Sequence, residues 1–317
     1  MMNSRFYTRD AQQKALGFLI NQAQRIERTV YATRYADIQY PQLVPVDTTG
    51  PDWVTGVTYF SSDMVGRAQW FHGRGDDVPH AEVTREKFET TIALGAIGYD
   101  YDLQELGQAM LSGVDLRPEK GTAARRAAEE FVDRVAMFGD TAKGYFGLVN
   151  QPAVPTGPAA PGASTETEWA DKTSDEILAD VNTALTNQFT TTYGAEMSDS
   201  LLLPYSRLLT ISTMRIDEFN TQMVLDWITE NNIYTRQTGN ALTVRGVWGL
   251  DTAGAGGTAR MVTYRRSPDV VTLYMPMPFQ FLPVWQQGPM KFEVPGIFRI
   301  SGVEARRPEA MTYVDGI

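Results

Sequence analysis

The sequence contains no cysteine and only two histidines, which removes several kinds of chemistry at the outset. Without thiols there is no disulfide, no thiolate nucleophile and no cysteine-ligated zinc. Both histidines, His72 and His80, fall in one short polar stretch without a third ligand at a matching spacing, and no G-x-S-x-G nucleophile motif occurs. The sequence therefore predicts no catalytic, cofactor or metal site, and we expect a protein that is not an enzyme.

Long apolar runs and a surplus of basic residues are also missing. No segment reaches the roughly 18 consecutive apolar residues of a membrane span, and the first ten residues are not those of a secretory signal. We therefore expect no membrane partner and a product of the cytoplasm. Lysine and arginine number 28 against 38 aspartates and glutamates, a net charge of −10. The basic residues form scattered pairs rather than a stripe, which argues against sequence-specific contact with DNA.

The clearest pattern lies between Gly121 and Asn150, where a helix is followed by a tight turn rich in glycine. Pro118 suits the first turn of this helix, and Gly139 suits the left-handed residue that ends one. Apolar residues recur at steps of four and three, so they share one face. These residues are Ala124, Ala128, Phe131, Val135 and Phe138. The pattern predicts a core helix with Phe131, Val135 and Phe138 among its packing residues.

The first fifty residues combine a helical pattern, from Asp10 to about Arg28, with an extended segment that contains Tyr31, Tyr35 and Tyr40. Prolines 41 and 45 favour extended backbone in the residues before them. An extended segment cannot bury its own tyrosines. It must either lie on another surface or fold back on the core of its own chain, and the sequence leaves both possibilities open.

Residues 51–98 show the pattern of two long strands around a polar tip, HGRGDDVPH, at residues 72–80. The first strand is expected within 53–71, and the return run places Phe88, Ile92 and Leu94 on one face. A hairpin this long is poorly stable alone and needs a partner surface. The candidate contact residues are charged or polar and lie at the tip and in the second strand. They are His72, Arg74, Asp76, Asp77, Arg85 and Lys87.

The remaining segments alternate between helical and strand patterns. We expect a helix after Tyr99, with Asp100 and Asp102 at its start, and a linker at 151–172. A capping box formed by Thr173 and Glu176 predicts a helix start. Further on, the pattern predicts a strand at 201–203, a helix at 217–231 and a strand-rich end from residue 232. Prolines 276, 278 and 283 argue against a central strand in their segment.

Taken in order, these segments resemble the major capsid proteins of tailed bacteriophages, whose fold encapsulin shells share. The resemblance extends to the ending SGVEARRP…VDGI after a proline-rich strand pair. It implies an α+β capsid fold with an N-terminal arm at 1–50 and an extended loop, the β-hairpin, at 51–98. A peripheral domain with the spine helix and linker would span 99–172, an axial domain 173–265, and the return strands of the peripheral domain 266–317.

The resemblance also implies a function. The chain would self-assemble into pentamers and hexamers of an icosahedral head that encloses double-stranded DNA, and would reside in the virion after synthesis in the host cytoplasm. Its partners would be copies of itself, with portal, decoration and separate scaffolding proteins. Arm and hairpin would overlap neighbouring subunits, which adds Tyr31, Tyr35 and Tyr40 to the contact residues. Two alternatives stay open: an encapsulin-like compartment with a cargo-peptide groove, and a soluble α+β hydrolase with a deep pocket of perturbed titratable groups.

Overall fold

The computed structural model describes residues 37–65, 80–102, 104, 116–217, 220–288 and 290–317. The chain forms two units, Met1–Asp37 and Ile38–Ile317, and the account below concerns the second. The predicted helix from Asp10 to Arg28 lies outside the described residues. So do most of the predicted contact residues, namely Tyr31, Tyr35, His72, Arg74, Asp76 and Asp77.

A five-stranded sheet lies between two hydrophobic cores. Its strands, in spatial order, are β5 (Thr156–Pro158), β16 (Met311–Asp315), β10 (Arg260–Tyr264), β6 (Ser200–Pro204) and β9 (Thr243–Val247). Every residue of β6 and β10 is buried, because both faces of the sheet are covered. Alternation along these strands sends Leu202 and Val262 into one core, and Leu201, Leu203 and Met261 into the other.

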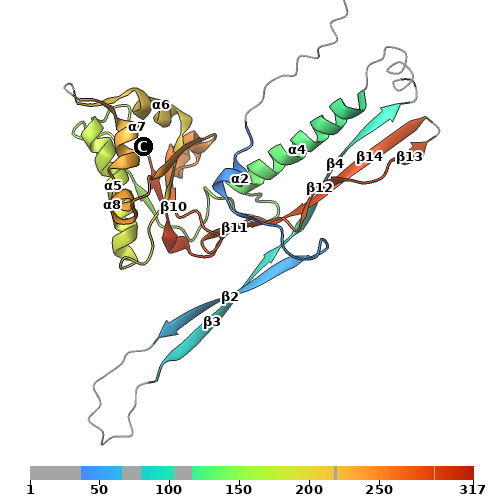
Figure 1. Ribbon diagram of the computed structural model, residues 1–317, viewed down its shortest axis with the longest axis horizontal. Helices are drawn as coiled ribbons and strands as arrows, with labels where there is room; N and C mark the ends of the chain where they lie inside the picture. Colours follow the sequence, from blue (N-terminus) through green and yellow to red (C-terminus); the bar gives the residue numbers. More distant parts are fainter. Residues whose placement is uncertain (1–36, 66–79, 103, 105–115, 218–219, 289) are drawn as a thin grey trace, which may run out of the picture. The chain divides into compact units, whose positions relative to one another are not determined.

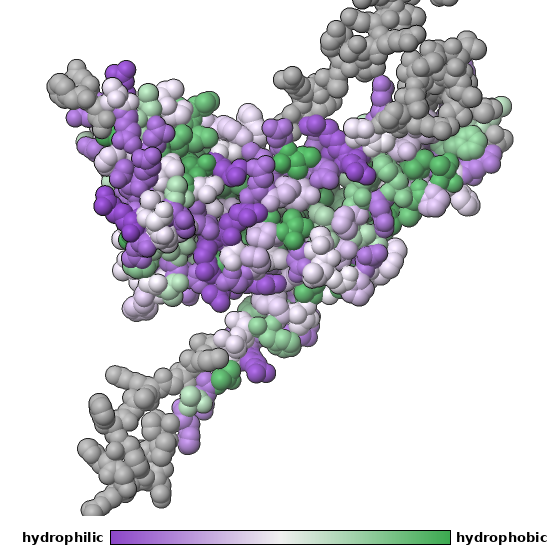
Figure 2. Space-filling view, viewed as in Figure 1, coloured by the Kyte–Doolittle hydropathy of each residue, from purple (hydrophilic) through white to green (hydrophobic). Residues whose placement is uncertain are grey.

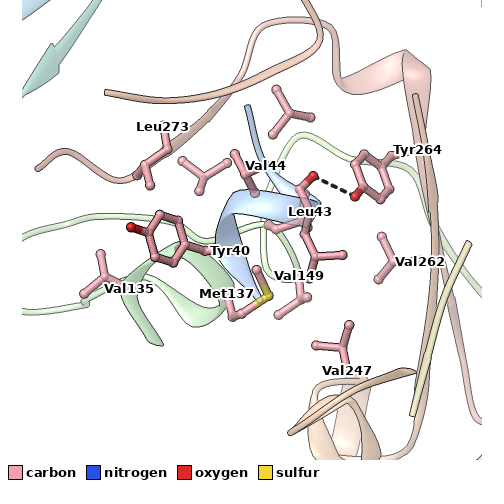
Figure 3. Packing of buried hydrophobic residues seen from close by; sticks show 14 of the residues in the cluster. Tyr40, Leu43, Val44, Val135, Met137, Val149, Val247, Val262, Tyr264 and Leu273 are labelled. Carbon is pink, nitrogen blue, oxygen red and sulfur yellow. Dashed lines mark hydrogen bonds between the residues drawn. The ribbon is translucent and has the colours of Figure 1, made fainter. Parts of the chain in front are cut away.

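The first core gathers side chains from segments that are far apart in the sequence (Figure 3). The elements around it are α2 (Tyr40–Leu43), α4 (Leu116–Phe138) and a three-stranded sheet of β1 (Val46–Asp47), β11 (Val271–Tyr274) and β15 (Val303–Ala305). The Tyr264 hydroxyl of β10 donates a hydrogen bond to the Leu43 carbonyl oxygen at 2.8 Å, which ties α2 to the five-stranded sheet.

The second core lies on the other face of that sheet and is covered by short helices (Figure 1). These are α5 (Ser174–Thr191), α6 (Tyr205–Thr213), α7 (Val224–Glu230) and α8 (Ile233–Thr238). Thr173 directly precedes α5, as predicted. The Glu176 carboxylate accepts hydrogen bonds from the Thr173 N–H at 2.8 Å and from the Thr173 hydroxyl at 3.0 Å. The described residues also form the 3₁₀ turns η1 (Leu250–Thr252), η2 (Ala255–Gly257) and η3 (Pro308–Ala310).

The helix predicted over 217–231 is wrong in its first half. Only Val224–Glu230 is helical, as α7, and a small hairpin of β7 (Arg215–Asp217) and β8 (Asn220–Met223) precedes it. Main-chain groups in this hairpin pair with each other, as at Arg215 and Met223, and the Val224 N–H reaches the Met214 carbonyl oxygen at 3.0 Å. These pairings use the groups that a longer helix would have needed.

The helix α4 covers a separate sheet built around β14 (Lys291–Ile300). Strand β4 (Ala93–Asp102) pairs with one edge of β14 over ten residues, while β12 (Met277–Phe281) and β13 (Trp285–Gly288) share the other edge. Pro278 therefore lies in an edge strand, as its missing N–H requires. The Phe131 ring of α4 meets the Phe298 ring of β14 edge-on, with ring centroids 5.8 Å apart.

Helix α4 ends at Phe138, as the sequence predicts. Gly139 has φ of +70°, and its N–H donates to the Val135 carbonyl oxygen at 2.8 Å. Val135 is 2 % exposed, whereas Phe131 and Phe138 are partly buried against the same core. The turn that follows crosses α4 closely, since a Cβ on Gly147 would lie 2.2 Å from the Met137 carbonyl oxygen. Only glycine fits at that crossing.

The return strand of the hairpin ends earlier than predicted. Strands β2 (Gly56–Val65) and β3 (Glu82–Thr91) pair with each other, and we call this pair the ribbon. After Ile92 the chain enters β4 in the sheet of β14, and the face that points inward changes. Leu94 and Ala96 are exposed rather than sharing the inner face, and Asp100 and Asp102 lie in a strand rather than at a helix start.

The predicted segment boundaries also do not coincide with the boundaries of the sheets. The boundary at residue 98 falls inside β4, and β16 leaves the return strands for the five-stranded sheet. The linker contributes β5 to that sheet, and it also supplies Trp169, which is fully buried in the second core. Among the described residues, no helix has the length and apolar character to cross a membrane.

Candidate inter-subunit contact surface

The ribbon is the part of the described chain that buries least of itself. Its strands pair over ten residues, from Gly56 opposite Thr91 to Val65 opposite Glu82, and among the described strands each pairs only with the other. Nine of the ten residues of β3 are exposed. Two strands with both faces open to solvent have no core of their own, so the ribbon depends on a further surface for burial.

The two faces of the ribbon differ in chemistry. Residues directly opposite each other share a face, so Phe60 and Lys87 lie on one face with Arg85, while Tyr59 and Phe88 lie on the other. The Phe60 side chain is 66 % exposed, and the Tyr59 and Phe88 rings stack at 5.1 Å. Hydrophobic and hydrophilic residues lie side by side at the surface of the ribbon (Figure 2). This mixture of exposed aromatic and charged groups is typical of a protein–protein contact.

The base of the ribbon is held by polar contacts to β15. The Glu304 carboxylate accepts hydrogen bonds from the Tyr59 hydroxyl at 3.4 Å and from the Thr90 hydroxyl. The Arg306 guanidinium lies 5.5 Å from the centre of the Tyr59 ring. Burial and then the Glu304 carboxylate raise the pKa of Tyr59 to about 12, against the opposing effect of Arg306. The phenol therefore stays protonated and remains a donor at physiological pH.

A second contact supports the loop before β2. The Arg299 side chain is buried, and its Nη1 donates to the Asp52 carbonyl oxygen at 3.3 Å. The same guanidinium lies 5.7 Å from the Trp53 ring, which is nevertheless 66 % exposed. Trp53 thus adds a large apolar side chain to the surface beside the ribbon.

A hollow of about 950 Å³ separates β2 from the end of α5 and from η3. Its walls are charged: Glu196 bonds Arg307 at 2.8 Å and Arg265 at 3.1 Å, and Asp269 bonds Arg265 at 2.7 Å. The Ser267 hydroxyl, followed by the arginines, lowers the pKa of Asp269. Within the described ranges, no three metal-ligating side chains converge. The charged groups here pair with one another across the wall of the hollow.

Two of the predicted contact residues, Arg85 and Lys87, lie together on the open ribbon, where Lys87 forms an ion pair with Glu89. Tyr40 does not lie at such a surface. It is 7 % exposed in the first core, and its hydroxyl donates to Glu129 at 3.1 Å. Burial, and then the charge of Glu129, raise the pKa of Tyr40.

The expected extended arm therefore ends before residue 40. Tyr40 folds back on the core of its own chain, which is one of the two possibilities that the sequence left open. The cause is Asp133 on α4, whose Oδ1 accepts the Gln39 N–H at 2.9 Å and the Tyr40 N–H at 2.7 Å. These two bonds satisfy backbone N–H groups at the start of α2, which have no partner within the helix. Pro41 is the second residue of α2. Strand β1 then pairs in parallel with β11, so the segment is part of the fold.

Sequence reasoning missed the apolar residues of this surface and the polar base that holds it. Phe60 follows Tyr59 directly, and in a strand two neighbours point to opposite faces, so the pair already signalled an aromatic residue on each side. Glu304 and Arg306 carried no such signal, because they lie more than two hundred residues from the strands that they contact.

Comparison with known proteins agrees with this architecture. A family model described as major capsid protein matches residues 66–317. No curated protein matches the sequence. The capsid of Myoviridae phage XM1 has a similar structure, with a TM-score of 0.77 and 17 % identity over 94 % of this chain and 98 % of that one.

Two further solved structures resemble the chain at lower identity. The chain from Mycobacterium phage Bobi matches with a TM-score of 0.60 and 14 % identity, over 92 % of this chain and 94 % of that one. The capsid of an empty GTA particle matches with a TM-score of 0.63 and 10 % identity over the same shares, 92 % and 94 %. The predicted α+β phage capsid fold is confirmed. With four fifths of its residues matched by the family model, the chain belongs to the major capsid protein family, whose members are structural proteins of the shell rather than enzymes.

Proposed function

We propose that this chain is the repeating unit of a phage head, and that its copies self-assemble into pentamers and hexamers of an icosahedral shell enclosing double-stranded DNA. The observation that supports the proposal most is the ribbon, which leaves nine of the ten residues of β3 exposed in a chain of the major capsid protein family. A surface of this kind has a physical reason to exist if another copy covers it.

The ribbon suits the role of an arm that lies on a neighbouring subunit. Stable interfaces bury about 800 Å² on each partner and depend on a few aromatic anchors. Trp53 and Phe60, each 66 % exposed, are two such anchors, one beside the ribbon and one on it. Arg85 and Lys87 add charges that guide orientation and register more than affinity. The predicted tip residues His72, Arg74, Asp76 and Asp77, and the arm residues Tyr31 and Tyr35, remain part of this proposal.

The segments would divide the work of closing a shell. Residues 99–172 and 266–317 would form the peripheral domain, apart from β16, which pairs with β10 in the five-stranded sheet. Residues 173–265 would form the axial domain that meets its copies around the five-fold and six-fold axes. A closed shell requires each subunit to present matching surfaces to its neighbours under rotation. The two-sided burial of the five-stranded sheet supplies a rigid body on which such surfaces can be fixed.

The net negative charge of the chain supports a shell that binds the enclosed DNA only weakly. With a net charge of −10, weak or repulsive contact with DNA would favour release of the genome. We therefore propose that packaged DNA is enclosed without sequence-specific contact. Separate scaffolding, portal and decoration proteins complete the proposed set of partners, and the virion is the proposed location.

Assembly of the purified protein tests the proposal directly. We expect pentamers, hexamers or closed shells in size-exclusion chromatography and negative-stain electron microscopy. A compact monomer that persists at high protein concentration would contradict the proposal.

A deletion separates assembly from folding. Removing residues 72–80 should lower the yield of shells while leaving the free energy of unfolding of the remaining chain nearly unchanged. An unchanged shell yield after the deletion would show that the hairpin tip has no part in assembly.

A further inference from the structure

One carboxylate of the subunit body contacts both strands of the ribbon. Glu304 Oε2 accepts from the Tyr59 hydroxyl of β2, and Oε1 accepts from the Thr90 hydroxyl of β3. The Tyr59 contact is long, at 3.4 Å, so the carboxylate holds this strand by a weak hydrogen bond. A group that holds both strands at once opposes rotation of the ribbon in a way that a contact to one strand cannot.

The backbone that carries Glu304 is firmly placed. Its register partner in β11 is Thr272, 2 % exposed, and the preceding Val303 is 3 % exposed with its N–H bonded to the Phe146 carbonyl oxygen at 2.8 Å. After Glu304, the Arg306 N–H donates to the Val270 carbonyl oxygen at 2.8 Å. The carboxylate therefore projects from a fixed strand toward a ribbon that packs on little else.

Arg306 closes the arrangement from the other side of the Tyr59 ring. Its guanidinium lies 5.5 Å from the Tyr59 ring and 5.7 Å from the Tyr274 ring, donates to the Tyr274 hydroxyl, and reaches the Pro268 carbonyl oxygen at 3.1 Å. Tyr59 is thus held between a carboxylate at its hydroxyl and a cation at its ring. These contacts are directional, whereas apolar packing would tolerate sliding.

We propose that Glu304 is a positioning residue that sets the direction in which the ribbon leaves the subunit, and so the angle at which a neighbouring copy is met. This inference rests on the proposed function for its consequence in assembly, while the placement of the ribbon can be measured without any shell. Because the base is polar and small, losing the carboxylate frees the direction of the ribbon and leaves both buried cores intact.

The absence of cysteine from the chain makes a distance measurement simple. Ser62→Cys on β2 and Glu309→Cys on η3 place two spin labels across the hollow that both residues line. Pulsed electron spin resonance on the unassembled protein should give one narrow distance distribution. Glu304→Ala should broaden that distribution about twofold, as expected for a segment that samples several orientations. Glu304→Gln should lie between the two, since an amide has only one acceptor oxygen.

The controls separate positioning from general damage. Glu230→Ala removes an exposed carboxylate of α7, away from the base of the ribbon, and should leave the distribution unchanged. Thr90→Val keeps the size of the side chain but removes the hydroxyl that donates to Glu304, so it should broaden the distance distribution. Thr90→Ser keeps the hydroxyl and should give the same narrow distribution as the parent. Thr90→Val also serves if Glu304→Ala fails to fold. An unchanged distribution in every folded Glu304 and Thr90 variant would overturn the inference.

Assembly provides the second measurement. If Glu304 sets the angle between copies, Glu304→Ala should shift shell diameters in electron micrographs toward a broader distribution, and Thr90→Ser should match the parent. Uniform shells of normal diameter from a variant with a broadened distance distribution would refute the link to assembly. If the parent protein forms no shells, the proposed function fails, and the spin-label distances still decide whether Glu304 positions the ribbon.

Discussion

The ribbon and the five-stranded sheet are made of the same kind of structure and differ in almost everything else. In β6 and β10 every residue is buried, whereas in β3 nine residues of ten are exposed. Both satisfy main-chain hydrogen bonds through pairing, so pairing is not what separates them. Burial separates them, because it supplies most of the free energy that favours folding. The sheet therefore stabilises the subunit, and the ribbon contributes little burial to it.

The largest effect should come from a charge placed inside the first core. Val135→Asp on α4 replaces a side chain that is 2 % exposed with an unpaired carboxylate, at a cost of several kcal/mol. We expect loss of the folded state, seen as loss of the cooperative transition in urea monitored by circular dichroism. Arg125→Asp, at an exposed position of the same helix, is the matched control and should retain the transition. A folded Val135→Asp protein would show that α4 turns a different face to the core.

The next effect concerns a buried ion pair behind the second core. Lys172 and Asp180 are 2.6 Å apart with side chains 1 % and 5 % exposed, and Trp169 Nε1 donates to Asp180 at 2.9 Å. Asp180→Asn leaves a buried ammonium without a counter-charge, and we expect about 3–5 kcal/mol less stability in urea unfolding.

A double substitution checks the cause of that loss. Lys172→Met together with Asp180→Asn removes both charges and keeps the acceptor for Trp169, so it should be more stable than Asp180→Asn alone. The exposed pair of Arg126 and Glu130 on α4 is the comparison, and Glu130→Gln should cost about 0.3–0.5 kcal/mol. Equal losses from the two pairs would contradict the role assigned to burial.

A pH series tests the hydrogen-bonded acid of the five-stranded sheet. Burial works against ionisation of Asp315, but hydrogen bonds from Arg260 and from the Ala255 N–H outweigh it and hold the pKa of this carboxyl below its ordinary value. A lowered pKa in the folded state adds stability above the unfolded value, about 3.9. That stability is lost as pH falls through the folded value.

We therefore expect Asp315→Asn to lower the free energy of unfolding by about 1–3 kcal/mol at pH 7. The difference from the parent should narrow once the pH falls below about 4, where the carboxyl of the unfolded parent takes up a proton, and should be lost as the pH falls through the lower pKa of the folded state. Urea unfolding at several pH values measures it. Glu309→Gln, at an exposed acid of the same C-terminal region, is the matched control and should change the free energy of unfolding at pH 7 by no more than about 0.5 kcal/mol. A constant difference across the series would show that Asp315 acts through packing alone.

The smallest effect on stability should come from the ribbon, and there the comparison is sharpest. Phe60→Ser and Arg85→Glu change exposed residues, so each should alter the free energy of unfolding by no more than about 0.5 kcal/mol. Shell yield should nevertheless fall for both. A ribbon substitution that lowers stability as much as Asp180→Asn would mean that the ribbon is packed within its own subunit.

The parts of the fold that the sequence predicts well are those set by local pattern. Val135 and its neighbours repeat at helical spacing, and Gly139 marks the end of the helix because its φ of +70° suits glycine. The short strand at 201–203 was recognisable from its apolar run between polar residues, and it is the centre of β6. In each case the signal and the structure lie within about one turn or one strand of each other.

The parts that the sequence did not predict depend on distant partners. Ile92 marks a change of sheet that only β14 explains, since β14 supplies the edge along which β4 continues. Tyr40 is buried because Asp133 captures the backbone beside it. For the ribbon itself, the pattern predicted a hairpin without a core, while the carboxylate that holds its base came from Glu304, at the far end of the sequence.

The order of strands in the five-stranded sheet has a consequence for synthesis. Strand β16 inserts between β5 and β10, so residues 311–315 fill a gap that stays open until they leave the ribosome. The ribbon closes between near neighbours in sequence and can form much earlier, because local contacts need less chain to be in place. A nascent chain would thus expose the ribbon before its five-stranded sheet is complete. Under the proposed function, unfinished chains on neighbouring ribosomes would already carry a surface that binds other copies.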